Sequence, residues 1–239
     1  MLLIELIPAI IFGVLIGNYT TTCLFRIPRS IDICGINVKH TQPPCCSTCR
    51  HPLKFYEFLP VLSWIFVRFK CNYCNTKINQ NYFILEFSNA CMSVILYSFL
   101  GYSEIYLLFM LLFAVSMLSG FIHLEKNYLY IKLTITSLVL GMLYRALSDG
   151  SILPFLTDLS VISIILISIL KSDKAYNSVY RNELTHIALQ LSIWSGLNPI
   201  PYITILAVYI ISVKKYLQYR YLNAIMMFYL YILFRICLE

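Results

Sequence analysis

The sequence predicts an all-α integral membrane protein of about eight transmembrane helices with a cytoplasmic zinc-binding loop domain. Three observations predict this fold class. Of 239 residues, 59% are hydrophobic and 12% are charged, whereas charged residues make up about 25% of a typical soluble domain. Apolar runs recur at the length of a bilayer span, about 17–25 residues. Two C-x-x-C pairs near the amino terminus interrupt this pattern.

The apolar runs divide the chain into three parts: a first transmembrane helix over 1–25, a loop over 26–80 and a transmembrane bundle over 81–239. The first run is too long for the h-region of a cleaved signal peptide and no basic stretch precedes it, so we expect it to remain as a helix. Within it, Gly13 and Gly17 lie four residues apart, a spacing that predicts close packing against another helix. The later spans are expected near 82–101, 104–122, 129–147, 151–170, 184–197, 199–213 and 221–238.

The span count has one alternative. The sixth and seventh runs are short and only Asn198-Pro199 separates them, so they can also be interpreted as one broken helix. Seven spans is therefore the alternative to eight.

The distribution of lysine and arginine predicts the orientation of the helices. The loop over 26–80 holds eight of these residues, and alternate later turns hold Lys126, then Lys171, Lys174 and Arg181, then Lys214, Lys215 and Arg220. The intervening turns hold none, although Arg145 lies close to one of them. Because positive charge gathers in short cytoplasmic loops, we expect a periplasmic amino terminus and a cytoplasmic cysteine loop. The basic residues form no single aromatic-flanked stripe, so the net charge of +7 indicates membrane lipid and no nucleic-acid partner.

The two cysteine pairs predict a metal site. Four thiolates in two closely spaced pairs can surround one Zn²⁺ tetrahedrally, and the candidate ligands are Cys46, Cys49, Cys71 and Cys74. The spacer of 21 residues slightly exceeds the usual range of such sites. A pair of disulfides or four reduced cysteines is the alternative, and a reducing cytoplasm disfavours the disulfides. Cys45, next to Cys46, could compete as a ligand.

The apolar stretch over 55–66, between the two pairs, is too short to span a bilayer, and Pro60 breaks it. The simplest interpretation is that this stretch lies along the membrane interface, with Trp64 and Tyr56 at the depth of the headgroups.

Several segments resemble the type IV prepilin peptidases, bifunctional bacterial inner-membrane enzymes of the aspartic class. The matching segments are 17–19, 26–29, the two C-x-x-C pairs, 59–64 between them and 82–86 after them. The resemblance is close over about residues 10–90 and fainter through the eight-helix plan. It implies a cytoplasmic site that cleaves the basic leader of a prepilin or pseudopilin and then methylates the new amino terminus with S-adenosylmethionine.

Leader cleavage in the family that this chain resembles relies on two aspartates, which can act as general base and general acid. Here the first aspartate position holds His123, and the second, in a motif that opens the sixth helix, falls on Leu184. Glu125 and Glu183 are possible substitutes, but they are displaced by about 200° and 100° around a regular helix. If the helix starts are irregular, Glu183 could still pair with Glu125 or with His123. The alternative interpretation is structural: the two glutamates are solvated loop ends, and His123 is a polar anchor at the membrane interface.

Three functional interpretations follow. The first is a divergent member of this family that recognises prepilins and has lost aspartic-type cleavage. The second is an active prepilin peptidase and N-methyltransferase that uses Glu125 and Glu183, although no cofactor-binding residues can be named because no glycine-rich cofactor signature is visible. The third belongs to another class, a metal or redox membrane carrier, and the near absence of ionisable residues from the centres of the spans argues against it.

Overall fold

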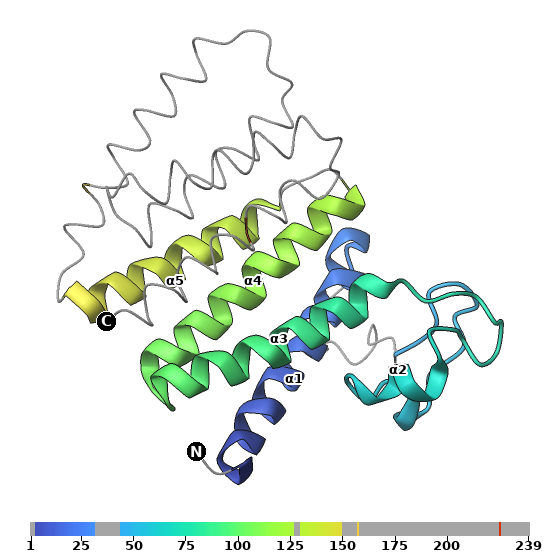
Figure 1. The fold of residues 1–239 in the computed structure, drawn as a ribbon. Helices are drawn as coiled ribbons and strands as arrows, with labels where there is room; N and C mark the ends of the chain where they lie inside the picture. Colours follow the sequence, from blue (N-terminus) through green and yellow to red (C-terminus); the bar gives the residue numbers. More distant parts are fainter. Residues whose placement is uncertain (1–2, 32–43, 127–129, 150–156, 158–224, 226–239) are drawn as a thin grey trace, which may run out of the picture. The chain divides into compact units, whose positions relative to one another are not determined.

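The computed structural model describes residues 3–31, 44–126, 130–149, 157 and 225. Its elements are α1 (Leu3–Arg26), the 3₁₀ turns η1 (Ile27–Arg29) and η2 (Phe55–Glu57), α2 (Leu62–Val67), α3 (Gln80–Leu100), α4 (Glu104–Lys126) and α5 (Ile131–Asp149) (Figure 1). Among these described residues there are isolated β-bridges and no strand. The helical class predicted from the sequence is therefore confirmed for these residues. The chain as a whole divides into two compact units, Met1–Ser98 and Phe99–Glu239.

Within the part of the chain that the structure describes, three helices are long and apolar enough to cross a membrane: Glu5–Arg29, Gln80–Leu100 and Glu104–Lys126. They coincide with the first three predicted spans. The helix α5 occupies the fourth, although its apolar part, Ile131–Tyr144, is shorter than a full span. The other four predicted spans lie outside the described residues, so the count of eight stays a prediction.

In the first unit, α1 and α3 pack closely where α1 carries its glycines. A Cβ atom added at Gly13 would lie 2.6 Å from the Cβ of Ser93, and one at Gly17 would lie 2.8 Å from the Cα of Glu86. The Ser93 hydroxyl donates a hydrogen bond of 2.6 Å to the carbonyl of Ala9. Small residues let two helix backbones approach in this way, so the packing predicted from the glycine spacing is confirmed.

One side of the short helix α2 is buried, and the other side is exposed. Ser63, Trp64 and Val67 are buried, whereas Leu62, Ile65 and Phe66 are exposed. The indole of Trp64 packs near the ring of Phe69, with the centroids 5.2 Å apart. Trp64 is therefore an interior residue and not the headgroup-facing residue that the sequence predicts, whereas Tyr56 is exposed.

In the second unit, α4 is buried along most of its length and packs on α5. The rings of Phe109 and Tyr144 meet edge to face, with their centroids 5.3 Å apart. His123 is 4% exposed near the carboxyl end of α4. A buried imidazole does not fit the interpretation of His123 as an interfacial anchor, because such a side chain would reach the membrane surface.

Candidate metal centre and the adjoining pocket

The first cysteine pair lies on a tight turn of the backbone over residues 44–53. The N–H of Cys46 donates to the carbonyl of His51 at 3.0 Å, and the N–H of Arg50 donates back to the carbonyl of Cys46, also at 3.0 Å. Arg50 has φ of 58°, a left-handed conformation that reverses the chain. Outside this turn, the N–H of Leu53 donates to the carbonyl of Pro44 at 2.8 Å. The turn holds both Cys46 and Cys49 at one end.

The second pair lies on a turn with the same hydrogen bonds, 25 residues later, over 69–78. Here the N–H of Cys71 donates to the carbonyl of Thr76 at 3.0 Å, and the N–H of Asn75 donates to the carbonyl of Cys71 at 2.9 Å. Asn75 has φ of 57°, matching Arg50. The N–H of Ile78 completes the pattern with a bond of 2.9 Å to the carbonyl of Phe69. The two turns are thus structurally equivalent, a repeat that the C-x-x-C spacing alone indicates only in part.

The two turns bring the four predicted ligand sulfurs together. The Sγ atoms of Cys46 and Cys74 are 3.8 Å apart, and those of Cys49 and Cys71 are 4.0 Å apart. All four lie within 4.8 Å of one another. A regular tetrahedron with Zn–S bonds of about 2.3 Å places its sulfurs about 3.8 Å apart. The cluster therefore has the donor type, number and spacing that a tetrahedral metal site needs.

The thiols of this cluster differ in their pKa. Thr76 lowers the pKa of Cys74 to about 6, because its hydroxyl and its backbone N–H both favour the thiolate. At the exposed Cys49, hydrogen bonding with the backbone of His51 lowers the pKa, but partial desolvation and the neighbouring cysteine sulfurs raise it to about 12. The backbone N–H of Thr48 also lies 3.5 Å from the Cys46 sulfur. Backbone N–H groups near the sulfurs suit thiolate ligands, because they stabilise negative charge.

Side chains outside the cluster connect the two turns. The rings of His51 and Tyr73, one from each turn, stack with their centroids 3.5 Å apart. Cys45 is not one of the four clustered cysteines. Among the described residues, the set of four thus matches the regular pairs predicted from the sequence.

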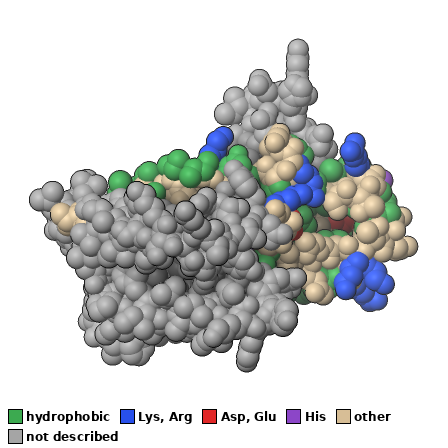
Figure 2. All heavy atoms as spheres, turned by 90° about the horizontal axis from the view of Figure 1, so that it is seen from above, with side chains coloured by type: hydrophobic (Ala, Val, Ile, Leu, Met, Phe, Trp, Pro, Cys, Tyr) green, Lys and Arg blue, Asp and Glu red, His purple; other side chains and the backbone are tan. Residues whose placement is uncertain are grey.

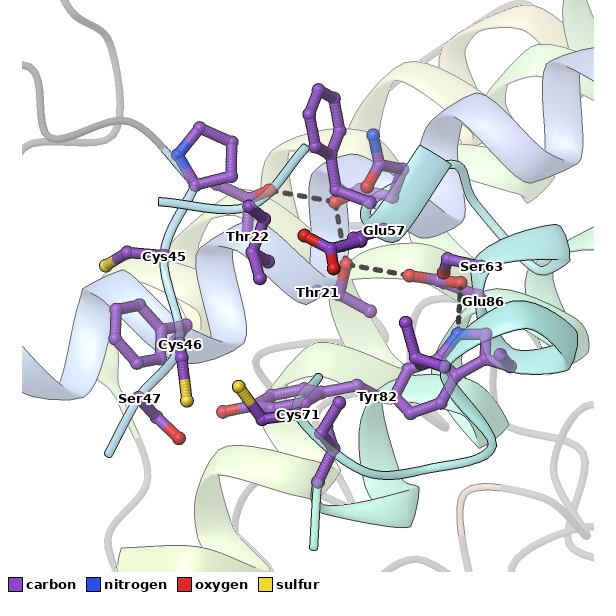
Figure 3. Close-up of a pocket in the computed structure, with 18 of the residues that line it drawn as sticks. Thr21, Thr22, Cys45, Cys46, Ser47, Glu57, Ser63, Cys71, Tyr82 and Glu86 are labelled. Atoms are coloured by element: carbon purple, nitrogen blue, oxygen red, sulfur yellow. Dashed lines mark hydrogen bonds between the residues drawn. The ribbon is translucent and has the colours of Figure 1, made fainter. Parts of the chain in front are cut away.

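A pocket of about 330 Å³ adjoins the cluster within the first unit. Its walls come from the carboxyl-terminal half of α1, from the loop, from α2 and from the start of α3 (Figure 3). Cys46 and Cys71 form part of one wall. Two carboxylates, Glu57 and Glu86, and the basic residues Arg26 and Lys70 also line it. The pocket thus combines an apolar lining with both signs of charge.

Glu57 holds the loop beside this pocket. Its Oε2 accepts a hydrogen bond of 2.8 Å from the N–H of Lys54, and its Oε1 accepts one of 2.7 Å from the Asn72 side chain. Lys54 precedes η2, and Asn72 lies in the second cysteine turn. The buried carboxylate therefore connects the segment between the turns to the turn that carries Cys71 and Cys74.

Glu86 is the residue of this site that sequence reasoning missed. Its Oε2 accepts hydrogen bonds from the N–H of Val61 at 2.8 Å and from the indole of Trp64 at 2.9 Å. Its Oε1 accepts a third, of 3.3 Å, from the hydroxyl of Thr21 on α1. One carboxylate thus joins α1, α2 and α3. The sequence feature that could have identified Glu86 is its position inside a predicted span, because an ionisable residue there marks a candidate functional site.

The residues proposed for catalysis lie in the second unit or outside the described residues. His123 is buried on α4, and Glu125 is half-buried on the same helix. Because α4 is helical through Lys126, Glu125 stays about 200° from His123 around the axis. Leu184 and Glu183 lie outside the described residues, so their pairing with His123 or Glu125 stays a prediction.

Comparison with known proteins identifies the first unit. Residues 11–100 match the model of the bacterial peptidase A24 N-terminal domain. The chain is 26% identical over 165 residues to the prepilin leader peptidase/N-methyltransferase of Neisseria gonorrhoeae, a match that covers 61% of this chain and 57% of that protein. This chain is a divergent relative of the prepilin leader peptidases.

Other relatives with the same name support this assignment. The protein of Aeromonas hydrophila is 28% identical over 159 residues, covering 57% of this chain and 53% of the relative. That of Aeromonas salmonicida (strain A449) is 33% identical over 103 residues, covering 43% and 35%. The chain thus spans about half the length of the first relatives it matches. No solved structure matches it.

Proposed function

We propose that this protein recognises prepilins or pseudopilins at the cytoplasmic face of the bacterial inner membrane, in type IV pilus or type II secretion biogenesis. The observation that carries the proposal is the pocket beside the cysteine cluster, built from the part of the chain that matches the peptidase family. The pocket is bounded by the ends of two candidate spans, α1 and α3. A substrate that is itself anchored in the membrane can reach such a site without leaving the bilayer.

The cluster serves this function by holding one structural Zn²⁺ through Cys46, Cys49, Cys71 and Cys74. A bound metal supplies folding free energy that a short loop with a small core lacks. Zinc would therefore order the two turns and, through Asn72 and Glu57, the wall of the pocket. No chemical step is assigned to the metal, because a site with four protein ligands leaves no open position for substrate.

We further propose that aspartic-type leader cleavage is absent, which makes the protein a pseudoenzyme for this step. His123 and Leu184 stand at the two aspartate positions of the family that the chain resembles. A leucine cannot accept or donate a proton, and two cooperating carboxylates are needed. On the α4 side, Glu125 does not replace the lost carboxylate at the same place, since the helix is regular there.

N-methylation is a second candidate function, favoured by the same pocket. S-adenosylmethionine carries a sulfonium and an ammonium group, and the pocket offers the buried carboxylates of Glu57 and Glu86. When bound, the cofactor would supply the methyl group for a free amino terminus. Transfer of labelled methyl from S-adenosylmethionine to a mature pilin peptide tests this candidate independently of cleavage.

Coexpression with a candidate prepilin tests the main proposal in cells that lack any other prepilin peptidase. A photo-crosslinking residue replaces Phe58, which lines the pocket, or Phe99, an exposed residue near the carboxyl end of α3, as a control. We expect a crosslink to the prepilin from position 58 only, with the leader still attached. Leader loss with the unaltered protein would contradict the loss of cleavage, and equal or absent crosslinking at both positions would contradict recognition in the pocket.

A further inference from the structure

The segment around η2 and α2 carries large apolar side chains that are exposed on the protein surface and not packed in its core. Their exposed fractions are high: 69% for Phe55, 44% for Tyr56, 53% for Leu62, 71% for Ile65 and 61% for Phe66. We call these five residues the exposed apolar face. The same helix α2 buries Ser63, Trp64 and Val67 on its other side, so the two sides are clearly separated.

Hydrogen bonds set the level of this segment along the candidate spans. Val61 and Trp64 both donate to Glu86, which lies six residues after the first residue of α3. At 1.5 Å per residue, that is about 9 Å along the helix axis. Thr21, which donates to the same carboxylate, lies five residues before the end of α1. The segment therefore lies beside the last turns of α1 and the first turns of α3. It does not extend beyond the ends of these helices.

At this depth along the spans, a bilayer presents the boundary between its headgroups and its apolar acyl chains. Interfacial helices bury their apolar side about 5–10 Å into the boundary between headgroups and acyl chains. The helix α3 has 21 residues, or about 31 Å, which matches a hydrocarbon core of about 30 Å. A segment held about 9 Å along this helix therefore lies near that boundary, where an exposed phenylalanine or isoleucine is favourable.

Basic residues border the exposed apolar face. Lys54 precedes Phe55, and Arg68 follows the end of α2; both are exposed. Lysine and arginine side chains stand out at several points of the described surface (Figure 2). Basic side chains beside an apolar face suit the anionic headgroups of a membrane surface.

We propose that the exposed apolar face inserts into the cytoplasmic leaflet of the bilayer and anchors the cysteine loop there. Glu86 transmits this anchoring to the pocket, because its carboxylate joins α2 to α1 and α3. The pocket mouth is then held at the lipid surface. The proposal concerns how the loop is seated and holds whether or not the pocket binds prepilins.

Tryptophan fluorescence of the full chain in lipid nanodiscs tests the proposal. In a Trp194→Phe background, Trp64 is the remaining native tryptophan and reports the buried side of α2. Phe66→Trp adds a reporter on the exposed apolar face, and Thr48→Trp adds one at the exposed end of the first cysteine turn. Each signal is taken as the difference from the background protein. Brominated phosphatidylcholine quenches from the acyl chains, and acrylamide quenches from water.

We expect brominated lipid to quench the added emission of Phe66→Trp at least twofold more than that of Thr48→Trp, and acrylamide to show the reverse order. Quenching of position 66 by acrylamide and not by lipid would overturn the proposal. Protection of position 66 from both quenchers would also overturn it, because a protein surface would then cover the face. Equal lipid quenching at positions 66 and 48 would refute insertion by this face. An unchanged helical circular dichroism spectrum confirms that each variant is folded.

Discussion

The indole Nε1 of Trp64 donates a hydrogen bond of 2.9 Å to the carboxylate of Glu86, and this pair connects the cysteine loop to α3. Both side chains are buried. Glu86 also accepts from Val61 of the loop and from Thr21 of α1. The wall of the pocket thus depends on one carboxylate within a candidate span.

Replacing Glu86 by leucine should destabilise the first unit by about 3 kcal/mol, because the buried indole N–H of Trp64 and the part-buried N–H of Val61 would lose their acceptor. Glu86→Gln should cost less, since an amide keeps one acceptor. Thermal unfolding of detergent-purified protein measures both effects, with Glu5→Gln, at an exposed carboxylate of α1, as the control. In a Trp64→Phe background the cost of Glu86→Gln should fall by about 1 kcal/mol; strict additivity would show that the pair is not coupled.

Purified protein should contain one tightly bound Zn²⁺ per chain. Replacing Cys46 and Cys71 together by serine should abolish it, because two of four ligands are lost, whereas Cys45→Ser should leave it unchanged. Elemental analysis measures the metal. Limited proteolysis should then show cleavage within 40–80 while the helices stay in the membrane fraction. A preparation without stoichiometric zinc, or with zinc retained in the double variant, would refute the assignment.

Larger residues at the α1 glycines should separate α1 from α3. The added Cβ of Gly13→Ala would lie 2.6 Å from Ser93 and 2.9 Å from the backbone of Ala90, and such overpacking costs about 1–3 kcal/mol. Leu15→Ala, on the exposed side of α1, should change stability by less than about 0.5 kcal/mol. The same unfolding measurement compares the two variants. A Gly13→Ala protein as stable as the Leu15→Ala protein would contradict the close helix contact.

Thiol labelling tests the orientation predicted from the basic residues. Single cysteines at Ser103 or Ser148, in an otherwise cysteine-free chain, should react with an impermeant reagent in intact cells, and one at Ser172 should not. Labelling after cell lysis is the control, since Ser172 should then react. The reverse pattern would show that the cysteine loop faces the periplasm.

Restoring aspartate at the two family positions should give detectable cleavage of a prepilin leader. The variant combines His123→Asp and Leu184→Asp with Arg181→Gly and Glu183→Gly, which supply the missing carboxylates and glycines of the family motif. The mobility of a coexpressed prepilin measures cleavage, and the single variant His123→Asp is the control, because one carboxylate does not suffice. If the unaltered protein cleaves, loss of cleavage in Glu125→Gln or Glu183→Gln would identify the substitute acid.

The sequence by itself determined the helical class, the first three spans, the glycine contact on α1 and the four clustered cysteines. Each of these depends on local information, namely the length of an apolar run or a fixed spacing along the chain. The length of an apolar run and the spacing of residues along the chain do not depend on which distant segments meet in the folded protein.

Tertiary structure alone decided which way the side chains of the cysteine loop face. The sequence predicts Trp64 as an interfacial residue, yet its indole is buried, and the carboxylate of Glu86, 22 positions away, accepts a hydrogen bond from its N–H. Glu86 became the centre of the pocket wall for the same reason, since its three donors come from α1, from the turn before α2 and from α2 itself. Such pairings depend on which segments meet in space, and no periodicity within one segment encodes them.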